Sequence, residues 1–341
     1  MIKADKTLDG RHVLVTGGAG FLGSEVVTQL SELGARVTVL DNLSSGKTDY
    51  VEGLKNVILI VGDVCDQRSV EKVMDKKDFI VHMSALPFIP DSYYHPEEFF
   101  KTNVMGTINI VRHSMATGKI KNFVHVSSSE VYGTAKYTPM DEKHPTLPHS
   151  TYAVSKLSAD RAVYTMHKEH GFPAVIIRPF NCYGPHVTQP YIVPEVAIQL
   201  VNGKDAIMLG NTETERDLCF VTDTARGIVA ALISDNAAGE TINLGSGTSI
   251  RIKDLLDQMA RILGKSVEVK TDPSRFRPYD VQTLICDNRR ALTLLDWQPQ
   301  VSLHDGLKLT IDWIKKNKVL FTSPFRGWPS SYRETRNLLT H

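Results

Sequence analysis

The chain of 341 residues is poor in cysteine, in long apolar runs and in net charge. No apolar run approaches the roughly 20 residues that a membrane-spanning helix needs. The polar start MIKADKTLDGRH has no signal-peptide core. The four cysteines form no CxxC pair, which argues against a disulfide scaffold and a zinc site: Cys65, Cys182, Cys219 and Cys286. We therefore expect a cytoplasmic protein with buried, reduced thiols, no metal and no membrane partner.

The charges of the two signs nearly cancel, with 39 Lys and Arg against 38 Asp and Glu. No block of like charges stands out, which argues against nucleic acid as a partner. Local arginines can still bind the phosphates of a small anionic ligand. The chain length suits one large domain with a smaller one attached.

Short apolar β runs alternate with helical segments through the first half of the chain. We expect a helix at 21–33 and strands at 12–16, 36–40, 57–61, 79–82, 123–127 and 174–178. Strands that alternate with helices predict a parallel sheet with helices on both faces. With right-handed crossovers, the expected fold class is α/β, a Rossmann-like doubly wound sheet.

The pattern loosens after about residue 179. Helical segments are expected at 193–201, 224–233 and 253–263, and β segments at 241–244 and 267–270. We expect a first domain at 1–180 and a smaller C-terminal α/β domain at 181–317 that completes a cleft. Some segments of the second domain can return to the main sheet. An irregular tail is expected at 318–341.

The first expected strand runs directly into TGGAGFLG at 16–23, with glycines at positions 17, 20 and 23. A turn without Cβ atoms lets backbone N–H groups and a helix N-terminus approach a pyrophosphate. Because the motif lies between a strand and a helix, it indicates a dinucleotide site more strongly than its spacing alone.

Asp41 ends the second expected strand, where a carboxylate can accept hydrogen bonds from both ribose hydroxyls and repel a 2′-phosphate. Neutral Asn42 follows, so we expect NAD rather than NADP; the alternative is an Asp that caps a turn. Asp63 follows the third strand, where it can hold the adenine amine or serve as the N-cap of the next helix.

Tyr152 and Lys156 form a YxxxK pair at the start of an expected helix. The i,i+4 spacing puts both on one helix face. We expect the ammonium and a nicotinamide to lower the Tyr152 pKa and make it a base for a sugar hydroxyl. The alternative is a solvated helix face. The segment SSSEVYG at 127–133 supports the catalytic interpretation, because it follows the fifth strand and supplies a hydroxyl about 24 residues before Tyr152.

These motifs together resemble the extended branch of the short-chain dehydrogenase/reductase superfamily, the nucleotide-sugar epimerases and dehydratases. The matching pieces are TGGAGFLG, Asp41, GDV, HMSA at 82–85, Asn103, SSSEVYG, YAVSK and RPFNCYGP, with weaker matches at Arg216-Asp217 and at RFRP, 275–278. The resemblance implies an NAD-dependent enzyme with a UDP- or GDP-linked sugar as substrate. It also implies a homodimer, formed through helices near 97–117 and 151–169.

The resemblance assigns roles to residues position by position. It places Ser128 beside the substrate C4 hydroxyl, with Tyr152 as the C4 base and Lys156 as its partner. The cofactor positions are Gly17, Gly20, Phe21, Leu22, Gly23, Asp41, Asn42, Asp63, Val64, Ser84, Ala85, Asn103, Tyr152 and Lys156. Asn181, Arg216 and Arg277 fall where the diphosphate of the sugar nucleotide is gripped. For each arginine the alternative is a surface ion pair.

Glu130 separates the possible reactions. A 4,6-dehydratase needs a carboxylate near C5, and Glu130 stands two residues past Ser128. UDP-galactose 4-epimerases carry a non-acidic residue there. The Ser-Ser-Glu at 128–130 is closer to the Thr-Ser-Glu of GDP-mannose 4,6-dehydratases than to the Thr-Asp-Glu of dTDP-glucose 4,6-dehydratases. The C6 proton donor is then Ser129 or a water.

The surrounding stretch is most similar to bacterial 4,6-dehydratases of GDP-N-acetylglucosamine. We expect a nucleotide-sugar 4,6-dehydratase with Glu130 as the C5 base. A 4-epimerase is the main alternative. UDP-glucuronate decarboxylases also carry Thr-Ser-Glu and stay open, as does a non-enzymatic NAD-binding protein.

Overall fold

The computed structural model describes residues 8–204, 206–276 and 280–317. A seven-stranded parallel sheet forms its larger part, in the strand order β10-β6-β5-β4-β1-β2-β3. The strands are β1 His12–Thr16, β2 Arg36–Asp41, β3 Val57–Val61, β4 Phe79–His82, β5 Asn122–Val126, β6 Ala174–Pro179 and β10 Thr241–Leu244. The order reverses at β1, which is the doubly wound topology expected from the sequence.

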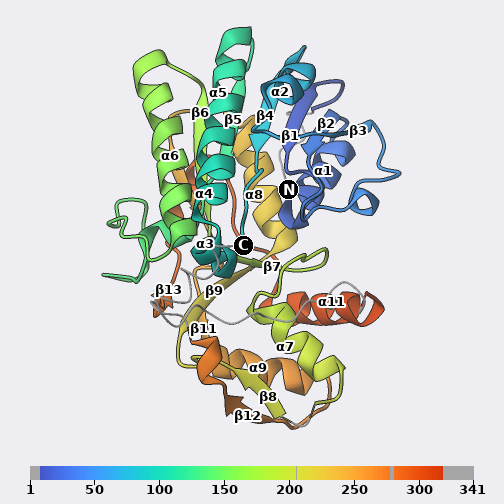
Figure 1. Cartoon of the computed structure of the whole chain (residues 1–341), viewed down its shortest axis with the longest axis vertical. Coiled ribbons are helices and arrows are strands. Elements are labelled where there is room, and N and C mark those ends of the chain that lie inside the picture. The colour runs from blue at the N-terminus through green and yellow to red at the C-terminus, as the bar shows by residue number, and fades with distance from the viewer. Residues whose placement is uncertain (1–7, 205, 277–279, 318–341) are drawn as a thin grey trace.

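Helices cover both faces of this sheet (Figure 1). One face carries α1 Phe21–Glu32, α8 Val221–Ile233 and α10 Arg289–Leu295, and the other carries α2 Gln67–Met74, α5 Gly106–Thr117 and α6 Thr151–His170. The expected α/β class is confirmed. Of the expected elements in the first half, most agree with the structure to within a residue.

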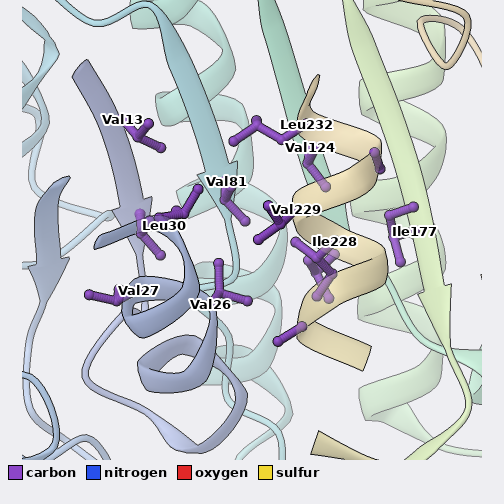
Figure 2. Packing of buried hydrophobic residues seen from close by; sticks show 14 of the residues in the cluster. Val13, Val26, Val27, Leu30, Val81, Val124, Ile177, Ile228, Val229 and Leu232 are labelled. Carbon is purple, nitrogen blue, oxygen red and sulfur yellow. The ribbon is translucent and has the colours of Figure 1, made fainter. Parts of the chain in front are cut away.

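The alternation of side chains along β1 explains the two layers. Val13 and Val15 point into the core beneath α1 and α8, whereas Leu14 joins the core beneath α2, α5 and α6. Figure 2 shows Val13, Val81 and Val124 of the sheet against residues of α1 and α8. Because both faces of β1 are buried, its sequence at 13–15 is a continuous apolar run.

A smaller group of elements lies below the main sheet in Figure 1 and has a separate apolar core. Its helices are α7 Ile192–Val201, α9 Ile252–Ile262 and α11 Leu303–Lys316. Its strands are β7 Asn181–Tyr183, β8 Ala206–Leu209, β9 Glu215–Phe220, β11 Ser249–Arg251, β12 Glu268–Thr271 and β13 Thr283–Leu284. β10, which falls within the expected second domain, instead forms the edge strand of the main sheet beside β6.

Short helical turns complete the described chain: η1 Thr48–Tyr50, α3 Ile89–Tyr94, α4 Pro96–Phe99, the π-helical η2 Phe100–Met105, η3 Ser129–Tyr132 and η4 Pro273–Arg275. The helix expected near 97–117 is therefore three pieces, with a π-helical turn in the middle. The tail at 318–341 and Arg277 lie outside the described residues.

Within the described ranges, no helix combines the length and apolar character that crossing a bilayer requires. The same residues contain no group of three His, Cys, Asp or Glu placed to hold a metal ion. All four cysteines are free. Only Cys219 and Cys286 are buried, so the expectation of four buried thiols is wrong for Cys65 and Cys182, which are half-buried.

Candidate active site

A cavity of about 430 Å³ lies between the carboxyl ends of the main-sheet strands and the smaller group of elements. The carboxyl ends of parallel strands meet at one edge of a sheet, and this edge is where doubly wound folds bind ligands. Residues that follow β1, β2, β3, β4, β5 and β6 all reach the wall of this one cavity. Motifs spread over more than 160 residues of sequence therefore converge on a single site.

The glycine turn between β1 and α1 forms one end of the cavity. Gly17 has a φ of +71°, and a Cβ there would stand 2.8 Å from the backbone nitrogen of Ser84. A Cβ at Gly23 would stand 2.0 Å from the Gly17 carbonyl oxygen. The N-cap of α1 is Gly20, without a side-chain bond to the first turn. The first N–H groups of α1 are thus left for an anion, and the turn fits a diphosphate.

Asp41 lies on the cavity wall at the end of β2 and is 7% exposed. Its Oδ2 accepts the Ala19 N–H at 3.0 Å, and its Oδ1 accepts the Leu43 N–H at 2.8 Å. Burial raises the pKa of Asp41, and the two backbone donors oppose that rise. The carboxylate is held between the glycine turn and the next loop, and each oxygen keeps a second lone pair for a ribose hydroxyl.

Asp63 also lines the cavity, and it does not cap α2. Asp66 is the N-cap, accepting the N–H groups of Arg68 and Ser69. The N-cap alternative for Asp63 is therefore wrong. Asp63 Oδ1 accepts the Cys65 N–H at 2.7 Å, and its Oδ2 accepts from Asn42 Nδ2 at 3.1 Å.

Asn103 is placed differently from the other expected cofactor residues. The cavity is lined by Gly17, Gly20, Phe21, Leu22, Gly23, Asp41, Asn42, Asp63, Val64, Ser84, Ala85, Tyr152 and Lys156, whereas Asn103 is buried behind this wall. Its Oδ1 accepts the Leu86 N–H at 2.8 Å, and its Nδ2 donates to the Ser155 hydroxyl at 2.9 Å. From the π-helical turn, Asn103 thus joins the loop after β4 to α6.

The side chains expected to react come from two elements. Residues 127–132, here called the catalytic loop, follow β5 and present Ser128, Ser129 and Glu130 to the cavity. Glu130 is 9% exposed. Tyr152 and Lys156 enter the cavity from the first turns of α6.

The Ser128 hydroxyl is hydrogen-bonded to the Tyr152 side chain and accepts the Glu130 N–H at 3.2 Å. Burial raises the pKa of Tyr152 to about 12; the bond to Ser128 opposes this rise and the Glu130 carboxylate adds to it. The expectation of a lowered Tyr152 pKa is therefore wrong for the protein alone. The reason is that desolvation of the tyrosinate dominates, while the ammonium of Lys156 donates to the Val126 carbonyl.

The expected diphosphate residues have different surroundings. Asn181 lines the cavity at β7, and its buried Oδ1 accepts no hydrogen bond from any described residue. Arg216 lines the cavity from β9, is 6% exposed and pairs with Asp280 at 3.3 Å. The surface ion pair considered for Arg216 is wrong, because both partners lie on the cavity wall.

Several lining residues were missed by sequence reasoning. Tyr191 precedes α7 and packs edge-on against Phe88. Glu195 of α7 binds Arg275 Nη1 at 2.7 Å, and Thr214 lies beside β9. Arg275 stands in the RFRP segment, so that motif was a usable signal. The other three carry no local pattern that distinguishes them from ordinary helix and loop residues.

Comparison with known proteins gives consistent results. The family model described as GDP-mannose 4,6 dehydratase matches residues 14–310. A dTDP-glucose 4,6-dehydratase of Streptomyces niveus is 32% identical over 318 residues, which cover 90% of this chain and 94% of that protein.

Solved structures show the same similarity. An epimerase of Methanothermobacter thermautotrophicus superposes with a TM-score of 0.87 at 30% identity, covering 93% of this chain and 96% of that one. A dTDP-glucose 4,6-dehydratase of Streptomyces venezuelae, solved with NAD and TYD bound, has a TM-score of 0.83 at 29% identity. That comparison covers 91% of this chain and 99% of the other.

Proposed function

The chain belongs to the GDP-mannose 4,6-dehydratase-type family of nucleotide-sugar dehydratases and epimerases, and we propose that it is an NAD-dependent nucleotide-sugar 4,6-dehydratase. Family membership confirms the resemblance drawn from the motifs. The place of Glu130 carries the proposal, because its carboxylate lines the same cavity as Ser128, Tyr152 and Lys156. Elimination across C5 and C6 needs a base at C5, whereas inversion at C4 does not. The proposed substrate is a UDP- or GDP-linked hexose or N-acetylhexosamine.

Oxidation at C4 is the first step of the proposed reaction. Tyr152, held by Ser128, accepts the proton of the C4 hydroxyl while hydride leaves C4. The form of Tyr152 that can accept this proton is the tyrosinate, which the ammonium of Lys156 stabilises before the transfer and which becomes a neutral phenol after it. When bound, NAD takes up this hydride and later returns it to the sugar. In the proposal, the glycine turn at 17–23 holds the pyrophosphate of NAD and Asp41 holds a ribose.

Elimination follows from the chemistry of the 4-ketone, which acidifies the hydrogen at C5. Glu130 removes that proton, and the C6 hydroxyl gains a proton and leaves as water. Hydride then adds to C6 and a proton returns to C5, which gives a 4-keto-6-deoxy sugar. Ser129, which is buried on the cavity wall, and a water are the two candidates for the proton donor at C6.

A nucleotide-sugar 4-epimerase is the second candidate function. The epimerase of Methanothermobacter thermautotrophicus, with its TM-score of 0.87, supports this alternative. Both reactions begin with the same C4 oxidation, so Ser128, Tyr152 and Lys156 serve either one. The two differ in whether Glu130 takes part.

A substrate panel tests the proposal directly. The enzyme is incubated with NAD and with UDP-, GDP- and dTDP-linked hexoses and N-acetylhexosamines, and each product is measured by mass spectrometry. A dehydratase removes the mass of one water from its substrate. An epimerase changes the retention time of the sugar nucleotide and leaves its mass unchanged. A product of unchanged mass with every substrate would replace the dehydratase by the epimerase.

The same proposal includes a homodimer. Apolar side chains are exposed on the segment from α4 to α6: Phe100 is 39% exposed, Met105 52% and Val154 38%. η2 packs against both α5 and α6, so the three exposed side chains belong to elements that contact one another. In Figure 1, α5 and α6 lie side by side in the upper part of the molecule, away from the smaller group of elements. Such a surface is suited to bury a matching surface of a second copy.

A further inference from the structure

A buried ion pair lies directly behind the catalytic loop. Asp160 of α6 is fully buried, and its Oδ2 accepts the Ser127 hydroxyl at 3.0 Å and Arg178 Nε at 2.8 Å. Arg178 Nη2 donates to Asp160 Oδ1 at 3.3 Å, so the guanidinium and the carboxylate meet as a fork. Burial works to raise the pKa of Asp160, but the guanidinium groups of Arg178 and Arg161 beside it hold that pKa below its usual value. Asp160 is therefore a carboxylate at neutral pH.

The same guanidinium reaches the other end of the catalytic loop. Arg178 Nη1 donates to the hydroxyl of Tyr132 at 2.9 Å, and that hydroxyl donates to Asn243 Oδ1 at 2.8 Å. The Arg178 guanidinium also lies over the Tyr132 ring, 4.9 Å from its centroid. Tyr132 is fully buried. The loop is thus bound at its first residue through Asp160 and at its last residue through Arg178.

The position of Asp160 on α6 gives these bonds a consequence for the reaction. Tyr152, Lys156 and Asp160 stand at i, i+4 and i+8, on one face of α6. The helix that supplies the C4 base therefore also carries the group that binds the loop with Ser128 and Glu130. One buried pair links the two halves of the active site.

We propose that Asp160 and Arg178 are positioning residues, which set the place of the Ser128 hydroxyl and the Glu130 carboxylate relative to Tyr152. The contacts at the two ends of the catalytic loop carry this positioning role. The assignment of a particular reaction step to each end rests on the proposed dehydratase. Ser127 immediately precedes Ser128, so its bond to Asp160 governs the C4 oxidation. Tyr132 follows Glu130 by two residues, so its bond to Arg178 governs proton removal at C5.

Two variants, each lacking one hydroxyl group, test the two ends of the catalytic loop separately. Tyr132→Phe keeps the buried ring and loses both hydrogen bonds, and Ser127→Ala loses the bond to Asp160. Each is expected to lower kcat by about 10- to 100-fold with KM within about twofold, because a reactive group displaced by about 1 Å loses rate more than affinity. Tyr132→Phe should accumulate enzyme-bound NADH, whereas Ser127→Ala should slow the formation of NADH in a single turnover.

Tyr164→Phe is the matched control. Tyr164 is a partly buried tyrosine of α6 outside the cavity lining. Its ring lies 4.6 Å from the guanidinium of Arg161, a second partner of Asp160, and the change to Phe keeps this ring contact while removing a hydroxyl that bonds neither Asp160 nor Arg178. Its variant should keep the wild-type kcat. A loss in the control equal to that in Tyr132→Phe would overturn the proposal, because the effect would then be general destabilisation. Unchanged kcat in both network variants would overturn it as well.

Hydrogen exchange distinguishes this proposal from the dehydratase assignment. The backbone amides at 128–133 should exchange about tenfold faster in Tyr132→Phe, while those at 156–163 in α6 keep their protection. This result supports the anchoring whatever reaction the enzyme catalyses. If the wild type removes no water from any substrate but the exchange changes as expected, the dehydratase fails and the anchoring stands. Unchanged exchange at 128–133 overturns the anchoring.

Discussion

Lys156 Nζ donates a 2.6 Å hydrogen bond to the carbonyl oxygen of Val126, the last residue of β5. The bond places the ammonium where the sheet passes into the catalytic loop. Lys156 is 4% exposed, and burial lowers its pKa to about 8, with Asp160 opposing that shift. The cation beside Tyr152 therefore titrates within reach of physiological pH, and its protonation becomes linked to folding.

This linkage predicts how stability depends on pH. The pKa of Lys156 is about 8 in the folded protein against an ordinary value of 10.5, so between these values the unfolded state binds more protons. The contribution of Lys156 to stability should therefore rise as pH increases from 8 toward 10.5. Relative to Lys156→Met, the free energy of unfolding of the wild type should increase by about 1 kcal/mol between pH 7 and pH 9. Urea unfolding of both proteins at these two pH values measures it. Identical pH dependence in both would contradict the lowered pKa.

Glu130→Gln should block elimination and spare oxidation at C4. Loss of a general base costs about 10²- to 10⁴-fold in rate, so overall turnover should fall by that range. Reduced cofactor should accumulate on the enzyme and be visible by the absorbance of NADH. Tyr152→Phe is the comparison variant and should form no NADH, because it stops the first step. Full turnover by Glu130→Gln would exclude Glu130 as the C5 base.

Solvent deuterium gives an independent prediction for the wild type. In D2O the product should carry deuterium at C5, because the proton removed by Glu130 exchanges before one returns. NMR of the product reads the label directly. A 4-epimerase leaves the C5 hydrogen in place, so an unlabelled C5 would favour that alternative.

Asp41 should impose a preference for NAD over NADP. Its carboxylate is held on the cavity wall by the backbone of Ala19 and Leu43, where it would repel a 2′-phosphate. Asp41→Ala should narrow the ratio of the two dissociation constants by about tenfold or more. Fluorescence titration of both cofactors measures the ratio. Equal affinity of the wild type for NAD and NADP would contradict this role.

Met105→Glu should convert the proposed dimer into monomers, because it puts a charge into the apolar surface between α4 and α6. Light scattering should report twice the chain mass of 37.9 kDa for the wild type and a single mass for the variant. Ile58→Glu is the control, since Ile58 is 62% exposed on β3 at the opposite edge of the sheet. If the wild type has the mass of one chain at micromolar concentration, the dimer is ruled out.

The sequence by itself determined six of the seven strands of the main sheet, the helix that follows the first of them and the strand-end motifs. Buried strands read as apolar runs, and Gly17 stands in a turn whose positive φ favours glycine. These signals come from residues that are close together in the sequence, so they can be recognised without the tertiary structure. The convergence of Asp41, Glu130 and Tyr152 on one edge also followed, because parallel strands place their carboxyl ends together.

Tertiary structure decided what depends on partners distant in sequence. Asp66, not Asp63, caps α2, and Asn103 faces Leu86 and Ser155. The raised pKa of Tyr152 needs its burial, which no motif encodes. The link between Asp160 and Arg178 joins a helix to a strand that follows it, and neither residue belongs to a pattern that names the other. Desolvation and long-range pairing are properties of the packed molecule, so only the fold reveals them.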